Sequence, residues 1–384
     1  MKISVAKRLQ HVEEYYFSKK LREIEQLNAS GFNVINLGIG SPDLPPHPDV
    51  IETLHAEASK PDTHAYQSYK GAKALRFAMA GWYDRIYGVN LDAEREILPL
   101  IGSKEGVVHI CMTYLEAGDE ALIPDPGYPA YAAAVRLSGA TSLPYLLKEE
   151  NGWMPDLAEL EKRDLSKVKL MWINYPHMPT GAAGNQAMFE KLIEFAQKHN
   201  ILLCHDNPYS LILNSAAKSI MQVEGAKDVA IELNSLSKSS NMAGWRVGML
   251  VGAAERLEEV LRFKSNMDSG MFLPVQLAAA KALSLDQNWY KALNVQYESR
   301  RSEVFKILDQ VGCDYSTDQV GLFVWAKTPS NYSDGYAFSD EILNNYKVFI
   351  TPGGIFGEGG VGYIRVSLCA NLETLKEAAL RMNQ

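Results

Sequence analysis

VKLMWIN at residues 168–174, NQAMFEKLIEFAQKHN at 185–200 and ILLCHD at 201–206 follow one another in the middle of the chain. The first and third are short apolar runs with the length of buried strands, and the second has apolar residues at helical spacing. A strand, a helix and a second strand in this order predict two parallel strands joined by a crossover helix. This stretch therefore favours an α/β fold whose parallel sheet is covered on both faces.

The same alternation continues on either side of this stretch. SKEGVVHICMTYLE at 103–116 has helical spacing, with Ser103 as its predicted N-cap and Gly118 as its predicted stop. Further strands are predicted at EALIP (120–124), VAIELNSLSK (229–238) and GMLVGA (248–253). We expect a large domain at 46–275 with a mostly parallel, seven-stranded type of sheet sandwiched by helices.

The pattern changes after residue 275, where long helices precede the strand-like runs GLFVWAK, KVFITPG and GYIRVSL. We predict a smaller α+β domain over residues 276–384. The first 35 or so residues have the pattern of a charged amphipathic helix, and an N-terminal arm at 1–45 is expected to pack on that smaller domain.

Composition excludes several classes of function. The net charge is −8 and no run of five or more basic residues occurs, so the sequence carries no electrostatic footprint for nucleic acid. The four cysteines are widely spaced, which favours buried free thiols in a reducing compartment over a metal site. No stretch approaches the roughly 20 apolar residues of a membrane span, and the N-terminus lacks a signal peptide's apolar region. We expect a cytoplasmic protein that holds no metal and binds no membrane.

Polar side chains come at or after the ends of successive predicted strands. Asp125 follows one strand, and Asn174, Asp206 and Lys238 end the next three. Because ligands of open parallel sheets gather at the carboxyl ends of the strands, these four residues predict one site.

The segment NSLSKSSNMAGWRVG at 234–248 places Lys238 three residues after Ser235 and eight before Arg246. A lysine in a confined site near cations has a lowered pKa and becomes a nucleophile toward a carbonyl group. Ser235 and Arg246 can hold a phosphate beside it. The alternative is a surface lysine in a polar loop.

From about residue 35 to the C-terminus, the chain resembles the class I/II aminotransferases of the fold-type I pyridoxal-phosphate-dependent enzymes. The S-x-S-K-x5-G-x-R-x-G segment carries this resemblance together with GSKEG, PDPGYPAY, HDNPY and GYIRVSL, which come in the family's order. The resemblance implies pyridoxal 5'-phosphate bound to Lys238 as an aldimine. It also implies ping-pong transfer of an amino group between an L-amino acid and a 2-oxo acid.

The resemblance assigns cofactor contacts to matching residues. Lys238 is implied to be the general base as well as the cofactor lysine, and Tyr209 donates to the cofactor's phenolic oxygen. Asp206 pairs with the pyridine nitrogen, where a carboxylate strengthens the electron sink. Tyr128 stacks on the pyridine ring, and Asn174 belongs to the same cofactor site.

The phosphate site is expected at GSKEG, residues 102–106, which opens a helix. The free N–H groups of Ser103 and Lys104 and the helix dipole can meet an anion there, although an ordinary N-cap has the same pattern. Ser235 and Arg246 would complete this site.

Tyr66 in YQSYKG matches a tyrosine that reaches the phosphate from the neighbouring subunit, and Tyr69 is the competing choice. The resemblance thus implies a homodimer with shared active sites.

The substrate is expected to meet Arg365 and Gly40. Arg365, in GYIRVSL, matches the arginine that binds the α-carboxylate, for which guanidinium offers a planar bidentate fork. Gly40, in LGIGSPD, matches a glycine whose backbone approaches the same carboxylate.

Met178 departs from the family's pattern. NYPHMPTG carries methionine where the family usually has an asparagine that donates to the phenolic oxygen, and methionine cannot donate. The variation is either tolerated, with Tyr209 as the remaining donor, or it tunes activity. In the second case we predict a higher aldimine pKa than in Met178→Asn.

Other functions remain open on the sequence. A pyridoxal-phosphate lyase acting by β-elimination uses the same site, and a non-catalytic sensor is a further alternative. A transcription regulator would need a DNA-binding module before LGIGSPD, and the segment there is not basic.

The amino donor is not decided by the sequence. DSGMF at 268–272 has no arginine where some relatives place a second cation, and Lys104 is another candidate for that role. Tyr15, Tyr16 and Phe17 form an apolar wall of the site or anchor the N-terminal helix.

Overall fold

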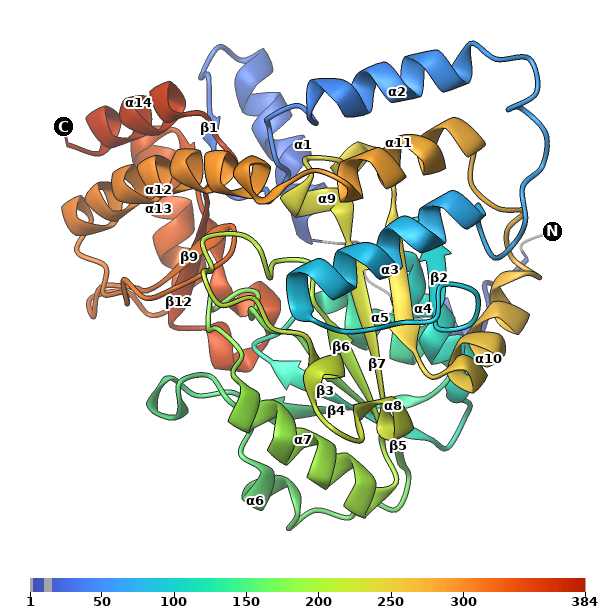
Figure 1. Cartoon of the computed structure of the whole chain (residues 1–384). Helices are drawn as coiled ribbons and strands as arrows, with labels where there is room; N and C mark the ends of the chain where they lie inside the picture. The colour runs from blue at the N-terminus through green and yellow to red at the C-terminus, as the bar shows by residue number, and fades with distance from the viewer. Residues whose placement is uncertain (1–2, 10–15, 384) are drawn as a thin grey trace.

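A computed structural model of the chain describes residues 3–9 and 16–383. Its centre is a seven-stranded sheet with the strand order β2-β8-β7-β6-β5-β3-β4 (Figure 1). The strands are β2 (Ile97–Leu100), β3 (Glu120–Asp125), β4 (Thr141–Leu146), β5 (Val168–Ile173), β6 (Leu202–Asp206), β7 (Ala230–Ser235) and β8 (Gly248–Gly252). Strands β4, β3, β5, β6 and β7 pair in parallel, whereas β8 is antiparallel to both of its neighbours. The predicted, mostly parallel sheet is confirmed.

Helices cover both faces of this sheet (Figure 1). They are α2 (Pro48–Ala58), α3 (Lys73–Tyr87), α4 (Ser103–Tyr114), α5 (Pro129–Ser138), α6 (Leu157–Leu160), α7 (Gln186–His199), α8 (Ala226–Val229), α9 (Leu236–Ser239), α10 (Ala254–Lys264) and α11 (Leu273–Leu283). Successive strand residues point to opposite faces. In β5, Met171 and Ile173 join the core under α3, α7 and α11, and Leu170 and Trp172 join the core under α4, α5 and α10.

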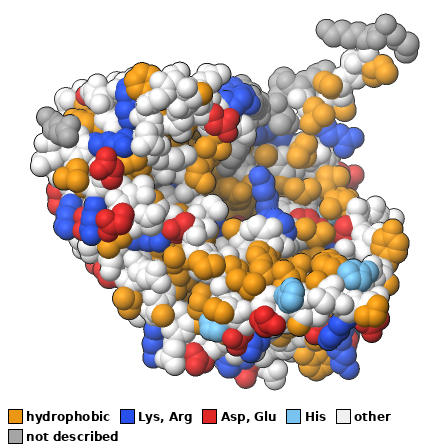
Figure 2. Space-filling model, turned by 90° about the horizontal axis from the view of Figure 1, so that it is seen from above, with side chains coloured by type: hydrophobic (Ala, Val, Ile, Leu, Met, Phe, Trp, Pro, Cys, Tyr) orange, Lys and Arg blue, Asp and Glu red, His pale blue; other side chains and the backbone are white. Residues whose placement is uncertain are grey.

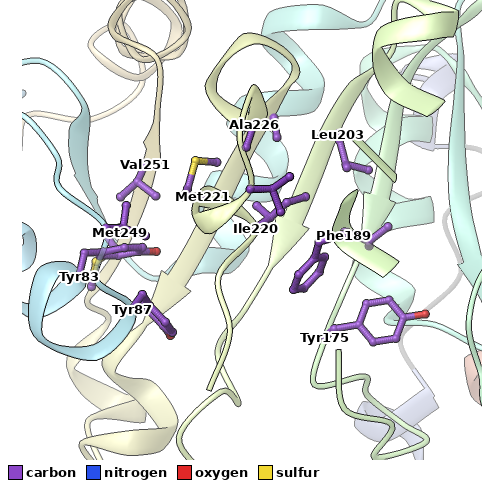
Figure 3. Packing of buried hydrophobic residues seen from close by; sticks show 14 of the residues in the cluster. Tyr83, Tyr87, Tyr175, Phe189, Leu203, Ile220, Met221, Ala226, Met249 and Val251 are labelled. Atoms are coloured by element: carbon purple, nitrogen blue, oxygen red, sulfur yellow. The ribbon is translucent and has the colours of Figure 1, made fainter. Parts of the chain in front are cut away.

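Figure 3 shows part of the first of these two cores. Tyr83 and Tyr87 of α3 lie beside Met249 and Val251 of β8, and Phe189 projects from α7. All five side chains are at least nine-tenths buried, so the apolar area that they remove from water holds the helices on the sheet.

A second, smaller unit contains the antiparallel sheet β11-β12-β9. It consists of β9 (Phe323–Lys327), β11 (Thr351–Pro352) and β12 (Tyr363–Ser367), with α12 (Gln287–Gln310), α13 (Gly335–Tyr346) and α14 (Leu372–Met382). Segments distant in sequence meet here, because β1 (Ile35–Asn36) pairs in parallel with β10 (Val348–Phe349). Helix α1 (Tyr16–Ala29) packs Ile24 against Leu343 and Phe349.

The boundaries of two elements next to the site, α4 and β7, differ from the sequence prediction. Gly102, not Ser103, is the N-cap of α4, and the helix ends before Gly118 because Leu115 is already extended at φ −115°. Strand β7 ends at Ser235, so Lys238 lies in the short helix α9 that follows. The Ser235 hydroxyl accepts from the Ser237 N–H at 3.1 Å, which caps α9 and stops the strand. Within the described ranges, no helix has both the length and the apolar character that crossing a membrane requires.

Candidate active site

A cavity of about 390 Å³ opens at the carboxyl ends of β5, β6 and β7. Figure 2 views this end of the molecule and shows a hollow in which hydrophobic side chains lie beside Lys and Arg. All of the predicted site residues except Tyr66 and Asp125 line the cavity, namely Gly40, Ser103, Lys104, Tyr128, Asn174, Asp206, Tyr209, Ser235, Lys238, Arg246 and Arg365. Residues from the large sheet and from the smaller unit therefore share one cavity.

Lys238 projects from α9 into this cavity. Its Nζ donates to the Gly40 carbonyl at 2.6 Å and lies 5.9 Å from the centre of the Tyr209 ring. Burial lowers the pKa of Lys238, and the positive charges of Arg365 and Arg246 act in the same direction. A larger fraction of neutral amine makes this lysine a better nucleophile toward a carbonyl carbon.

Asp206 ends β6 with its two carboxylate oxygens in different environments. Oδ2 accepts from the Tyr131 hydroxyl at 2.9 Å, whereas Oδ1 is buried and has no hydrogen-bond partner among the described residues. Burial raises the pKa of Asp206 to about 6. A buried oxygen without a donor is costly, so the geometry fits a cationic N–H group, such as a protonated pyridine, placed at Oδ1.

Tyr131 was missed by the sequence analysis. It lies in the first turn of α5, three residues after the N-cap Tyr128, so its spacing in PDPGYPAY was the available signal. The Tyr131 ring stacks on Trp172 with centroids 5.0 Å apart, which fixes its hydroxyl at Asp206.

An anion cradle lies where α4 begins. A Cβ added at Gly102 would come 2.1 Å from Arg246 Nη2, so any side chain there would displace the guanidinium. The Ser235 hydroxyl donates to that of Ser237 at 2.8 Å on the same cavity wall as Ser103. Free N–H groups at a helix start, a guanidinium and hydroxyls together match a phosphate. Ser237 was not predicted.

Arg365 lies in β12 on the opposite side of the cavity. Its Nη2 donates to the Gly38 carbonyl at 2.8 Å, and its Nη1 is 3.2 Å from Met178 Sδ. The guanidinium carbon lies 3.9 Å from the centre of the Phe323 ring and 4.7 Å from that of Phe356. These four neighbours hold the guanidinium in place.

Asn174 and Tyr209 both line the cavity, but the Asn174 side chain bonds to backbone groups whereas the Tyr209 hydroxyl can serve as a donor. The Asn174 amide donates to the Asp206 carbonyl at 2.6 Å and accepts from the Met178 N–H at 2.8 Å, so it ties together the backbone ends of β5 and β6. Burial raises the pKa of Tyr209 above its ordinary value. Its hydroxyl therefore keeps its proton and can serve as a donor.

Three expected residues lie elsewhere. Tyr66 and Tyr69 are 91% and 46% exposed, and neither lines the cavity. The Asp125 carboxylate accepts from the Gly359 N–H at 2.9 Å, so it ties β3 to the smaller unit and does not join the cavity lining.

The N-terminal helix also reaches the site. Phe17 lines the cavity, whereas Tyr16 packs edge-on against Tyr336 with ring centroids 6.0 Å apart. Tyr15 lies outside the described residues.

Comparison with known proteins identifies relatives over nearly the full chain. A sequence model of the family Aminotransferase class I and II matches residues 33–382. The chain is 40% identical to the LL-diaminopimelate aminotransferase of Dehalococcoides mccartyi over 382 residues, which cover 99% of this chain and 98% of that protein. The apo structure of BacF from Bacillus subtilis has a TM-score of 0.95 at 34% identity, covering 100% of this chain and 98% of BacF. An aminotransferase from Staphylococcus aureus has a TM-score of 0.90 at 29% identity, with coverages of 99% and 98%.

Proposed function

The chain belongs to the class I and II aminotransferase family and is an aminotransferase; from this premise we propose that it holds pyridoxal 5'-phosphate at Lys238 and moves an amino group between an L-amino acid and a 2-oxo acid in two half-reactions. One observation carries this proposal. A buried lysine with a lowered pKa and a buried carboxylate oxygen without a donor face the same cavity. The first suits a carbonyl carbon and the second a protonated ring nitrogen.

The residues of the cavity fit the parts of this cofactor. Ser103, Lys104, Ser235 and Arg246 would hold its phosphate at the start of α4, where the helix dipole favours an anion. Asp206 would hold the ring nitrogen. Tyr128 would cover the ring face, and Tyr209 would donate to the phenolic oxygen.

When bound, pyridoxal phosphate supplies an electron sink for the bond that breaks at the α-carbon. Lys238 would carry the proton of that carbon, since its Nζ is the basic group inside the cavity wall. Arg365 would bind the substrate's α-carboxylate, and Gly40 would approach it through its backbone, because Lys238 Nζ already contacts Gly40 O.

A homodimer with shared sites is part of the proposal. Tyr66 is too exposed to serve the cavity of its own chain, so its hydroxyl is free to reach a partner's phosphate. Tyr69, Phe77 and Phe272 are also exposed, and Figure 2 shows hydrophobic side chains gathered along one side of the face that it views. Such a patch suits a subunit interface.

The division into residues 1–45, 46–275 and 276–384 is likewise proposed as the domain structure; α11 (Leu273–Leu283) crosses the second boundary and packs on α2 and α3 of the large unit. We also propose a cytoplasmic location, which the four free, buried cysteines support.

Reductive trapping tests the proposal. The protein is incubated with pyridoxal phosphate, treated with borohydride, digested and analysed by mass spectrometry, and the cofactor's mass is expected on the peptide that contains Lys238. Lys238→Ala should lose both the trapped mass and all amino transfer, whereas Lys104→Ala should keep the trapped mass.

Trapping at another lysine would refute the site. With the cofactor in place, amino transfer leaves it in the amine form and releases a 2-oxo acid without ammonia. Release of ammonia with regeneration of the starting spectrum would instead indicate a lyase. The relatives' name makes LL-diaminopimelate one candidate donor for this screen.

A further inference from the structure

The charged groups of the cavity are unevenly distributed. Of the described residues that line it, Lys104, Asp206, Lys238, Arg246 and Arg365 are the lysine, arginine and aspartate side chains. Lys104 lies in the first turn of α4 beside the anion cradle, and the next three belong to the cofactor's proposed contacts. Arg365 is committed to the α-carboxylate. A second charged group on the substrate would thus meet no further charge on the Arg365 side of this lining.

The side chains around Arg365 are apolar and come from four separate parts of the chain. The guanidinium carbon lies 3.9 Å from the ring centre of Phe323, 4.7 Å from that of Phe356 and 5.7 Å from that of Phe17. Met178 adds its thioether at 3.2 Å from Nη1 and is only 5% exposed. All four side chains line the cavity, so they form an apolar surface next to the arginine that would bind the substrate's carboxylate.

Among these four side chains, Met178 says most about which substrate groups the cavity can bind. A thioether is polarizable and apolar, and it makes favourable contacts with aromatic and aliphatic groups. It offers no N–H donor to a second carboxylate and only a weak acceptor to an ammonium group. Burying a charged group against this wall would cost its hydration without replacing it.

We propose that the preferred amino donor has an uncharged, apolar side chain, held by Phe17, Met178, Phe323 and Phe356 next to Arg365. The inference rests on the proposed function and names its substrate class. Met178 is a specificity-determining residue in this site, because an amide at that position would give the wall a donor and an acceptor.

Two measurements test the substrate class. In the first, the cofactor-loaded protein is mixed with L-phenylalanine, L-leucine, L-aspartate or LL-diaminopimelate, and the loss of cofactor absorbance gives kcat/KM for each half-reaction. The apolar pair should exceed the charged pair by at least about tenfold, the scale on which apolar pockets discriminate. In the second, calorimetry compares 3-phenylpropanoate with succinate, two carboxylates that cannot react, and the former should bind at least about tenfold more tightly.

Variants at Met178 sharpen the test. Met178→Leu keeps an apolar side chain of similar volume and should retain the preference for phenylalanine over aspartate within about threefold. Met178→Asn should reduce that ratio by about tenfold or more, because it gives aspartate a hydrogen-bond partner and removes apolar contact. Because kcat/KM for both donors is measured on the same protein sample, the ratio of the two values does not depend on the fraction of the protein that is folded.

The outcomes separate the two proposals. Conversion of none of the donors, together with no cofactor on Lys238, would refute the proposed function. Conversion with equal or higher kcat/KM for aspartate or diaminopimelate, or tighter binding of succinate, would overturn the apolar class while leaving the aminotransferase intact. If Met178→Asn and Met178→Leu have the same ratio of kcat/KM for phenylalanine over aspartate, Met178 does not determine specificity.

Discussion

Replacing Asp206 by asparagine measures how much the buried carboxylate of the site lowers the free energy of unfolding. The carboxyl is 5% exposed, and burial raises its pKa from the ordinary value of 3.8 to about 6. The folded chain therefore binds this proton more tightly than the unfolded chain does. Consequently the free energy of unfolding falls as the pH rises from about 4 to about 6 and then stays level. A shift of about two pKa units corresponds to about 3 kcal/mol at pH 8.

Asparagine should recover most of this cost in the cofactor-free protein. It keeps an oxygen that accepts from the Tyr131 hydroxyl, whose bond to Asp206 measures 2.9 Å, and it carries no charge. We expect Asp206→Asn to raise the free energy of unfolding by about 3 kcal/mol at pH 8 and by about half as much at pH 5. The same change should weaken cofactor binding, because the negative charge next to the ring nitrogen is lost.

Urea unfolding of the cofactor-free proteins at the two pH values is the appropriate assay, read as the difference between wild type and variant. Asp84→Asn provides a matched control on an exposed aspartate and should change stability by less than about 0.5 kcal/mol. If Asp206→Asn is no more stable than wild type at pH 8, or if its advantage grows toward pH 5, the account of the buried carboxylate is wrong.

Two further substitutions probe the phosphate site and the proposed dimer. Gly102→Ala places a Cβ 2.1 Å from Arg246 Nη2 and should weaken cofactor affinity at least tenfold in fluorescence titrations, roughly the loss of one good charged contact. Gly118→Ala is the control, because Gly118 has a similar positive φ but no atom within 4 Å of an added Cβ. This control should lower the free energy of unfolding by about 1 kcal/mol and leave cofactor affinity unchanged. Tyr66→Phe should also weaken cofactor retention in dialysis, whereas Tyr69→Phe should not, and the reverse result would assign the in-trans contact to Tyr69.

The strand-end residues could be predicted from the sequence because they depend on one local rule. Once 168–206 is read as strand, helix and strand, Asn174 and Asp206 must end neighbouring parallel strands, and the structure brings their side chain and carbonyl to 2.6 Å. Lys238 reached the same edge although the strand before it is shorter than predicted. Asp125 also lies at the end of its strand, but its carboxylate accepts a hydrogen bond from the Gly359 N–H and does not line the cavity.

The remaining contacts depend on tertiary packing that no local pattern encodes. The contact between Met178 and Arg365 joins residues 187 positions apart, and it exists only because the small sheet closes against the large one. Phe323 and Phe356 look like ordinary core residues in the sequence, and each reaches the cavity from a different element. Ser237 was hidden because a strand was predicted where α9 begins.

The contact between Lys238 and Gly40 links the two halves of the site. Lys238 belongs to the large unit, whereas Gly40 follows β1, which pairs with β10 of the smaller unit. Gly40 also lies so close to Phe323 that an added Cβ would come 2.2 Å from its ring, so the backbone of Gly40 is packed against the apolar wall. The Lys238 Nζ donates only an N–H to the Gly40 carbonyl at 2.6 Å, so the lone pair of the neutral amine remains available for attack on a carbonyl carbon. A continuous set of contacts therefore joins Arg365, which would bind the substrate's carboxylate, through Phe323 and Gly40 to the Lys238 amine.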